Sequence, residues 1–373
     1  MSKAKIICVA TGIFPPDTGG PAKFAETFLK WCQQNGQRVE AVSLTDTATK
    51  DISFENANVK LISRNQILLK RYIKTILALS RKLLTRRAVI ANGLFLEVYF
   101  ASLVTHRRYI CKVPGDIVWE RARNSGYTKK SLEDFQQEPL NLKYKIFRSL
   151  FSKSLRRSRY VIVPTKQLQE LCFKWGVSKD KVVVIPNSVD TDYFISDFRV
   201  KKIFDVIVVN RLVPWKHVDR VISTCAPLGL SLAIVGDGPE KDQLEAVAIE
   251  QSAKATFFGN QTQSQVLGLL QKSSCFVLNS SFEATAYSLL EARSVGLFTI
   301  ATRKTGSSEV VDHYSDGLLC DDESLTLKDA LKVYMDDKDF VSKAVESARA
   351  DTERRFSVKT NYLKICNIVL DKT

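Results

Sequence analysis

The sequence has few of the residues from which disulfide frameworks and metal centres are built. Its eight cysteines are scattered with no C-x-x-C pair, and its three histidines, His106, His217 and His313, lie far apart. Scattered cysteines within apolar runs are typical of free thiols in a reduced compartment. We therefore expect a cytoplasmic protein without disulfides, without a bound metal ion and without another cofactor.

Long hydrophobic runs are also lacking. No uncharged apolar stretch of about 18 residues occurs, so the sequence predicts no transmembrane helix. The apolar part of MSKAKIICVATGIF is short for a signal peptide and runs directly into Pro15-Pro16, which favours a first buried strand. With 373 residues, of which 45% are hydrophobic and 25% charged, the chain is long enough for two globular domains.

Acidic residues are scarce in the first half of the chain. Residues 1–185 contain 33 lysines and arginines against 14 aspartates and glutamates, a net charge of +19, whereas the remainder contains 22 against 26. Segments 60–87 and 141–160 hold nine and seven basic residues and no acid. In 68–87, Leu and Ile alternate with Lys and Arg at helical spacing, as in an amphipathic surface helix. Solvated helix faces are one explanation, but the pattern favours an anionic membrane surface as partner. No reader motif or aromatic platform supports nucleic acid.

Short apolar runs alternate with longer helical patterns along the whole chain. Near-continuous apolar strands with helices between them predict parallel sheets covered on both faces, and therefore two doubly wound α/β domains in series. The hinge is predicted at 186–190, where PNSVD follows an apolar run, and a last helix at 356–370 is expected to pack back on the first domain. The predicted strands are 5–10, 39–44, 59–63, 88–92, 109–115, 159–165, 204–210, 231–238, 255–260, 274–280 and 297–302.

Two glutamates, Glu283 and Glu291, are the most informative motif. They lie eight residues apart in CFVLNSSFEATAYSLLEA, which predicts a strand, a loop and a helix with one carboxylate before the helix and one within it. Eight residues of helical rise correspond to roughly 12 Å, so the pair could contact the two ends of an extended ligand. The free N–H groups of the helix start would favour an anion between them. A glycosidase pair is disfavoured because that chemistry needs carboxyls converging on one bond.

Other polar residues and glycines follow predicted strands. Arg211 and Lys216 come after the strand VIVV, where two cations suit a diphosphate. Gly236, in the pair Gly236-x-Gly238, indicates a turn that faces a nucleotide, although the third glycine of a dinucleotide fingerprint is missing. Gly19 and Gly20 precede a helix and offer N–H groups to a phosphate or an acceptor group. The pair Asp190-x-Asp192 lies at the hinge, away from a strand end, which disfavours a metal site there.

Taken in order, these segments resemble glycosyltransferase family four, a family of retaining enzymes. The resemblance is carried by PPDTGG, VIPNSVDTDYF, NRLVPWK, VGDGP, FFGN, SSFEATAYSLLEA and ATRKTGSSEVVD, and it spans nearly the whole chain. It implies a GT-B fold, with two Rossmann-like domains facing each other across a cleft. The implied domains are a basic acceptor-binding domain at 1–186, a nucleotide-sugar-binding domain at 187–355, and a C-terminal helix at 356–373.

The resemblance also implies roles for individual residues. Arg211 and Lys216 would hold the diphosphate, Glu291 the ribose, and Glu283 the transferred sugar. The segment Phe258-Gly259-Asn260 would lie near the base, Gly19-Gly20 would close over the phosphates or the acceptor, and residues 306–309 would form another loop of the donor site. The family works without a metal, so cations and the helix start would neutralise the leaving group.

The sequence departs from the family pattern at two places. Ala284-Thr285-Ala286 replaces a turn that usually carries glycines. Many members place a histidine at a strand end of the first domain, where this chain has CKVPGDIVWE. Asp116 is the residue expected to act there as a catalytic group, with Lys112 and Glu120 nearby.

The expected function is transfer of a hexose from a UDP- or GDP-sugar to a glycan acceptor, most simply a lipid-linked one in the synthesis of cell-surface polysaccharide, at the inner face of the membrane. One alternative is a sugar-nucleotide epimerase of the same fold. Another is a basic protein on a decayed transferase scaffold that binds membrane or nucleic acid. The donor sugar, its base, the acceptor and the oligomeric state are left open, because pocket shape decides them.

Overall fold

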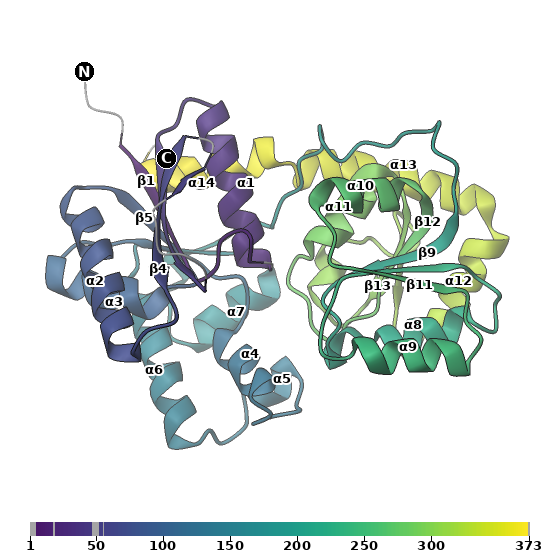
Figure 1. Ribbon diagram of the computed structural model, residues 1–373, viewed down its shortest axis with the longest axis horizontal. Helices are drawn as coiled ribbons and strands as arrows, with labels where there is room; N and C mark the ends of the chain where they lie inside the picture. The colour runs from purple at the N-terminus through teal and green to yellow at the C-terminus, as the bar shows by residue number, and fades with distance from the viewer. Residues whose placement is uncertain (1–4, 18, 47–51, 55, 372–373) are drawn as a thin grey trace. The chain divides into compact units, whose positions relative to one another are not determined.

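Two compact units make up the chain in the computed structural model, which describes residues 5–17, 19–46, 52–54 and 56–371. The N-terminal unit comprises the chain up to Pro186 and again from Tyr362, and the C-terminal unit comprises Asn187–Asn361. Each unit is built on one largely parallel sheet that helices cover on both faces (Figure 1). The two predicted α/β domains are therefore present as doubly wound folds.

The sheet of the N-terminal unit has eight strands in the order β3-β4-β2-β1-β5-β6-β7-β8. All neighbours pair in parallel except β3, which runs antiparallel to β4 at the edge. The central strand β1 is buried along its whole length, in keeping with its uninterrupted apolar sequence. The strands are β1 (Ile7–Thr11), β2 (Val39–Thr45), β3 (Ile52–Phe54), β4 (Ala57–Ser63), β5 (Ala88–Asn92), β6 (Ile110–Lys112), β7 (Tyr160–Val163) and β8 (Val182–Val184).

Right-handed crossovers place the helices of this unit on the two faces of its sheet. Helix α2 connects β4 to β5, across β1, whereas α3, α6 and α7 follow β5, β6 and β7 on the other side of β1; α1 connects β1 to β2. The last helix, α14, packs against α1, where the ring of Tyr362 contacts those of Phe24 and Phe28 edge-on. The helices are α1 (Gly20–Gln34), α2 (Leu68–Leu84), α3 (Phe95–Thr105), α4 (Ile117–Asn124), α5 (Leu132–Phe135), α6 (Leu142–Arg157), α7 (Lys166–Lys174), the 3₁₀ turn η1 (Lys179–Lys181) and α14 (Val358–Leu370).

The sheet of the C-terminal unit has six parallel strands in the order β11-β10-β9-β12-β13-β14. Alternation along β9 divides the core, because Val206 and Val208 pack into one cluster and Ile207 into the cluster on the opposite face. The strands are β9 (Phe204–Val209), β10 (Leu232–Val235), β11 (Ala255–Gly259), β12 (Ser273–Leu278), β13 (Phe298–Thr302) and β14 (Leu318–Cys320).

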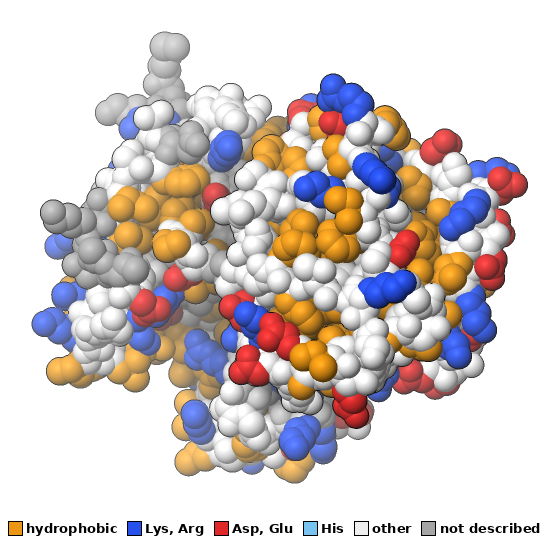
Figure 2. All heavy atoms as spheres, turned by 45° about the vertical axis from the view of Figure 1, so that its right-hand side comes forward, with side chains coloured by type: hydrophobic (Ala, Val, Ile, Leu, Met, Phe, Trp, Pro, Cys, Tyr) orange, Lys and Arg blue, Asp and Glu red, His pale blue; other side chains and the backbone are white. Residues whose placement is uncertain are grey.

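Helices α8, α9 and α12 cover the first of these two clusters, and α10 and α11 cover the second. On the face of this unit turned to the viewer in Figure 2, acidic and basic side chains are interspersed, as the near-neutral composition of this part of the chain predicts. The helical elements are η2 (Pro214–Lys216), α8 (Val218–Cys225), α9 (Lys241–Glu250), α10 (Gln263–Gln271), α11 (Tyr287–Val295), η3 (Gly306–Glu309), α12 (Leu327–Asp336) and α13 (Lys338–Arg355).

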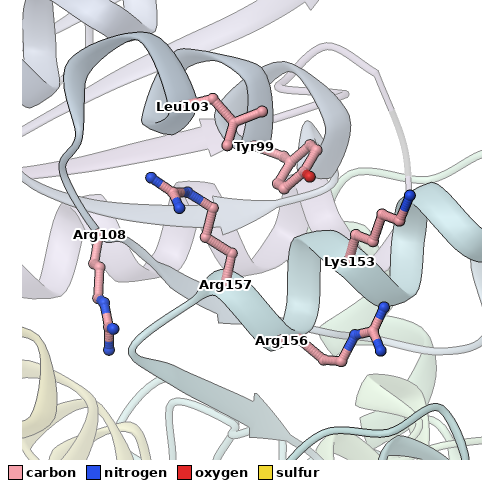
Figure 3. A pocket seen from close by; sticks show the side chains of 6 residues that line it. All are labelled: Tyr99, Leu103, Arg108, Lys153, Arg156 and Arg157. Carbon is pink, nitrogen blue, oxygen red and sulfur yellow. The ribbon is translucent and has the colours of Figure 1, made fainter.

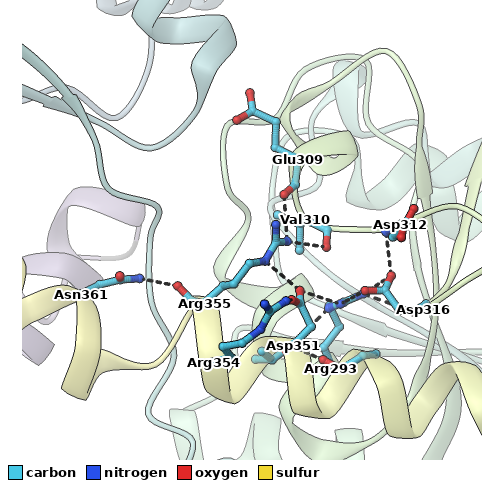
Figure 4. A network of polar contacts seen from close by, with 11 residues as sticks. Arg293, Glu309, Val310, Asp312, Asp316, Asp351, Arg354, Arg355 and Asn361 are labelled. Carbon is cyan, nitrogen blue, oxygen red and sulfur yellow. Dashed lines mark hydrogen bonds and ion pairs between the residues drawn. The ribbon is translucent and has the colours of Figure 1, made fainter.

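A buried ionic network holds α11 within the C-terminal unit (Figure 4). The guanidinium of Arg293 on α11 is fully buried and donates to both carboxylate oxygens of Asp316, at 2.6 and 3.1 Å. Asp351 on α13 lies 3.6 Å from the same guanidinium and also pairs with Arg355. Arg355 in turn donates to the backbone carbonyls of Glu309 and Val310. The network therefore fixes α11 and the end of η3 to α13.

All eleven strands predicted from the sequence are present, and the amphipathic segment 68–87 forms α2. The sequence analysis did not predict β3, β8 and β14, which are three residues long and lie at the edges of their sheets. The eight cysteines are buried as free thiols. A search of the described helices finds none with the length and apolar character that crossing a bilayer requires.

Candidate active site

The loops at the carboxyl ends of the strands in the C-terminal unit contain most of the residues predicted to bind the donor. Arg211 and Lys216 follow β9, Gly236 follows β10, Gly259 ends β11, and Glu283 follows β12. Because the strands are parallel, these ends lie at one edge of the sheet, which is the edge where ligands bind in open α/β folds. Glu291 lies farther along, in the second turn of α11.

An ion pair between Lys216 and Glu283 is the central contact of this edge. The Nζ of Lys216 contacts Oε1 of Glu283, and the hydroxyl of Ser280 donates to the same oxygen at 3.0 Å. The two charged side chains are 15% and 12% exposed, so both are largely withdrawn from water. Arg211 is exposed, and its side chain makes no ion pair with another described residue. Lys216 is thus held by Glu283, and Arg211 is the cation that faces solvent.

Backbone hydrogen bonds fix the loop that carries Glu283. The N–H of Ser281 donates to the carbonyl of Trp215 at 2.9 Å, and the N–H of Gly306 donates to the carbonyl of Glu283 at 2.8 Å. These bonds join the loop after β12 to the loops after β9 and β13, the neighbouring strands on either side. Three loops joined by hydrogen bonds therefore surround the ion pair, and they limit the positions that Glu283 can take.

Close backbone contacts explain why glycine occupies these loops. A Cβ atom at Gly236 would lie 1.8 Å from the carbonyl oxygen of Asn210, and one at Gly238 would lie 2.1 Å from that of Leu212. At Gly306 the corresponding distance to the carbonyl oxygen of Ala284 is 2.1 Å. Gly259 has space around it but a positive φ of 64°. The sequence predicted a nucleotide-facing turn at Gly236, and the structure adds tight packing between adjacent loops as a reason for the glycine.

The start of α11 offers N–H groups to an anion. Its N-cap residue is Ala286, which supplies no side-chain acceptor for the first turn. The N–H groups at the start of a helix favour negative charge. Helix α11 begins at Tyr287, so Glu283 lies outside it, as expected. Glu291 lies within α11 and is only 3% exposed.

Asn210 is a candidate ligand contact that the sequence analysis missed. It follows β9 directly, and both polar atoms of its side-chain amide are enclosed without a hydrogen-bond partner in the described residues. Enclosed amides without partners are rare in folded proteins, and they are often completed by a ligand or by water. A polar residue immediately after an apolar strand was the available signal, because it marks the carboxyl end of that strand.

The residues predicted in the N-terminal unit take different positions. Gly19 and Gly20 are exposed at the start of α1, and Gly19 is its N-cap with a φ of 139°. This helix start also lacks a side-chain cap, which fits the predicted N–H donors. Thr18 of the same motif lies outside the described residues.

The side chain of Asp116, which was predicted to be catalytic, makes structural contacts in the N-terminal unit. Its side chain caps α4 by accepting from the N–H groups of Val118 and Trp119. Its other oxygen accepts from Arg148 at 2.6 Å and from Gln136 at 2.9 Å, and the residue is fully buried. A carboxylate so enclosed has no free lone pair directed at a substrate, so we assign it to the stability of the N-terminal unit.

Lys112, at the carboxyl end of β6, is a buried lysine in a unit whose other lysines and arginines are mostly at the surface. Its side chain is buried above the ring of Phe24, with Nζ at 4.4 Å from the ring centroid, and burial lowers the pKa of Lys112 to about 7. Burial disfavours the protonated amine, so the unfolded chain binds the proton more tightly than the folded one.

We therefore expect Lys112→Met to raise the free energy of unfolding at pH 7, by at least about 1 kcal/mol. In the wild type, the contribution of Lys112 to the free energy of unfolding is most unfavourable below pH 7. It becomes less unfavourable as the pH rises from about 7, the pKa in the folded protein, to 10.5, the pKa in the unfolded chain. Urea unfolding at several pH values should therefore show a difference between variant and wild type that shrinks as pH rises. A constant difference would contradict the lowered pKa.

Comparisons with known proteins agree with this architecture. The family described as "Glycosyltransferase Family 4" matches residues 18–193, and "Glycosyl transferases group 1" matches residues 191–351. The structure of HepE from Anabaena in complex with UDP and glucose superimposes with a TM-score of 0.79 at 18% identity, and the match covers 98% of this chain and 99% of that one. The sucrose-phosphate synthase of Thermosynechococcus elongatus gives a TM-score of 0.81 at 13% identity, covering 99% of both chains.

Curated relatives match over shorter regions. The lipopolysaccharide core biosynthesis glycosyltransferase LpsD of Rhizobium meliloti is 33% identical over 158 residues, 42% of this chain and 46% of LpsD. One subunit of the phosphatidylinositol N-acetylglucosaminyltransferase of Arabidopsis thaliana is 32% identical over 145 residues, 36% of this chain and 32% of that protein. The chain thus spans about a third to a half of these relatives.

The two adjacent family matches together cover residues 18–351, and the solved structures share the fold of both units. The chain belongs to glycosyltransferase family 4 and has the GT-B fold that the sequence indicated.

Proposed function

We propose that the protein transfers a hexose from a UDP- or GDP-sugar to a glycan acceptor, with retention of configuration and without a metal ion. The observation that carries this proposal is the Lys216–Glu283 ion pair beside the exposed Arg211, at the carboxyl edge of the sheet. A basic group and a helix start without a side-chain cap are what a departing nucleoside diphosphate needs. The relatives named above include proteins whose names describe sugar transfer, which supports the same class of reaction.

Each group has a proposed role in this reaction. Arg211 and the start of α11 bind the diphosphate and stabilise the charge that develops on it as the glycosidic bond breaks. Glu283 contacts the hydroxyls of the transferred sugar, and Lys216 holds its carboxylate in place. Glu291 binds the ribose hydroxyls, and the enclosed amide of Asn210 completes its hydrogen bonds with the donor. The acceptor attacks on the face that the leaving group departs from, with a donor phosphate oxygen receiving its proton.

The acceptor is proposed to be a lipid-linked glycan at an anionic membrane surface. The support is the charge of the chain, because the excess of +19 lies in residues 1–185. The name of LpsD places that relative in the synthesis of the lipopolysaccharide core, and a lipopolysaccharide is itself a lipid-linked glycan.

A panel of nucleotide sugars tests the proposed donor. A matching UDP- or GDP-hexose at about 100 times its Kd is expected to raise the melting temperature by roughly 5 °C, because it binds the folded state alone. The shift should persist in EDTA, and Arg211→Met should reduce it. Lys201→Met, which removes an exposed cation of the same unit away from this edge, is the matched control.

The same samples distinguish the alternatives. A sugar-nucleotide epimerase would convert the donor without an acceptor, whereas a transferase leaves it largely intact until an acceptor is added. A binding protein on an inactive scaffold would show neither donor stabilisation nor turnover. If EDTA abolished the stabilisation by the nucleotide sugar, the result would contradict the metal-independent mechanism but not the proposed sugar transfer.

A further inference from the structure

Helix α2 presents a mixed basic and apolar stripe to solvent. Each of its exposed residues Lys70, Ile73, Lys74, Leu77, Arg81 and Leu84 lies three or four positions from another of them, so they share one helix face. Leu77 and Leu84 are 55% and 61% exposed, and together with Ile73 they form an exposed apolar row on this face. The three cations of the stripe make no ion pair with a described residue, whereas Lys82 and Arg87 on the inner side pair with Glu40.

The neighbouring helices continue this surface. Helix α3 packs against α2, and α6 packs against α3. The outward residues of α3 are Phe100, Leu103 and Val104, the last of them 72% exposed. Because all three helices run from the carboxyl to the amino ends of the strands, their C-terminal ends lie at the same end of the unit.

At that end α3, α6 and the segment before β6 border an open surface pocket of about 300 Å³, which is lined by four cations and no carboxylate (Figure 3). Its lining residues are Tyr99, Leu103, Arg108, Lys153, Arg156 and Arg157. Arg157 has a structural partner, because it donates to the hydroxyl and the carbonyl of Ser102 on α3. The side chains of Arg108, Lys153 and Arg156 make no ion pair with a described residue.

The charge in this pocket is not balanced by acids close in sequence. Residues 98–115 and 139–169 contain no aspartate or glutamate. Cations near a helix C-terminus interact favourably with the helix dipole, and α6 brings three of them within its last turn and a half. Three cations without acidic partners around a cavity favour a ligand with phosphate oxygens.

We propose that the face formed by α2, α3 and the end of α6 docks on an anionic membrane, with a lipid phosphate in the pocket. The leucines of the α2 stripe and the exposed apolar residues of α3 enter the boundary of the acyl chains, while the lysines and arginines contact headgroups. Leu103 belongs both to the apolar surface and to the pocket lining. A single orientation of the protein on the membrane therefore allows both the apolar contact with the acyl chains and the phosphate contact in the pocket.

The docking face is separate from the sugar-transfer chemistry within its own unit. The pocket lies at the amino ends of β6 and β7, since Arg108 precedes β6 and Arg157 precedes β7. Gly19 and Lys112 lie at the carboxyl ends of strands, the opposite edge of the same sheet. The inference rests on the proposed function and deepens it, because it names the surface that holds the protein on the membrane where a lipid-linked acceptor lies, but its test does not depend on transfer.

Vesicle sedimentation of the full chain tests the proposal. With phosphatidylcholine vesicles containing 30% phosphatidylglycerol, the wild type should bind at least 10-fold more tightly than with phosphatidylcholine alone. The triple variant Arg108→Gln/Lys153→Gln/Arg156→Gln should weaken this binding by up to about 100-fold, since each cation near an anionic surface contributes about fivefold. These residues are not in the proposed catalytic machinery, so stabilisation by the donor should be unchanged.

The matched control is Lys201→Gln/Lys328→Gln/Lys343→Gln, which removes the same net charge from exposed positions of the C-terminal unit. It should retain vesicle binding within about twofold. A second variant, Leu77→Gln/Leu84→Gln, keeps every charge and should weaken binding to anionic vesicles even in high salt, where the headgroup attraction is screened.

Four outcomes would overturn the proposal. Equal binding to neutral and anionic vesicles would remove the headgroup contact, and equal losses in both triple variants would show a general charge effect. Binding of inorganic phosphate by the pocket without vesicle binding would indicate a soluble anion as the ligand. Preference for single-stranded RNA over vesicles would indicate a nucleic-acid surface. Loss of donor stabilisation in the wild type, with vesicle binding intact, would contradict the proposed function and leave the docking face standing.

Discussion

Replacing Glu283 by glutamine is expected to lower the rate of sugar transfer by about 10²- to 10³-fold. The substitution keeps the shape of the side chain but removes the charge that Lys216 and Ser280 contact. In the proposed reaction this carboxylate orients the transferred sugar while the leaving group departs, so the loss should fall mainly on kcat. Initial rates at saturating donor and acceptor measure it.

The structure also predicts that this variant folds normally. Glutamine still accepts a hydrogen bond from Ser280, and the backbone bonds from Ser281 and Gly306 are unaffected. The free energy of unfolding should therefore fall by no more than about 1–2 kcal/mol. Glu353→Gln, on the exposed side of α13, is the matched control and should retain full activity. Full transfer activity in Glu283→Gln would show that this carboxylate has no part in the reaction.

Replacing Arg293 by methionine is expected to cost about 3–5 kcal/mol of stability. The change leaves Asp316 buried at 4% exposure without its charged partner, and it removes the contact between α11 and α13 that Figure 4 shows. The penalty arises mostly from the unpaired carboxylate, because a desolvated charge without a partner is costly. Urea unfolding of the variant and the wild type gives the difference.

Two further variants separate this explanation from a general loss of packing. Arg354→Met removes an exposed arginine that pairs with Asp351, a carboxylate that keeps its other partners, and should change stability by less than about 1 kcal/mol. Arg293→Met/Asp316→Leu removes both charges and should recover much of the stability lost in the single variant. If the double variant is no more stable than Arg293→Met, the stability lost in the single variant comes from lost packing and not from the unpaired charge of Asp316.

The apolar pattern of the strands predicted most of the fold. A parallel strand buried on both faces must be largely apolar, and this requirement is visible in four consecutive apolar residues of β1 (7–10), of β5 (88–91) and of β9 (206–209). The three short strands at or near the sheet edges carry too few residues for such a signal. Helix α2 was also predicted, because its one buried and one exposed face impose a period of 3.6 residues.

The candidate site was predicted only as far as strand ends could be located. Arg211, Lys216 and Glu283 follow apolar strands, and parallel topology then brings those ends to one edge of the sheet. The sequence did not show that Lys216 pairs with Glu283, because 67 residues separate them. Asp116 also follows a strand, but Arg148 and Gln136 enclose it through contacts that the local sequence does not reveal.

The sequence by itself determined the two α/β units, the family, and the unequal distribution of charge, because these depend on local periodicity, ordered motifs and composition. The tertiary structure alone decided which charges are neutralised and which are not. Lys216, Arg148 and Arg293 have carboxylate partners, whereas Arg108, Lys153 and Arg156 line a pocket without one. The physical reason is that a charge interacts with its neighbours in space, and those neighbours are fixed only when the strands are ordered in the sheet and the helices packed on its faces.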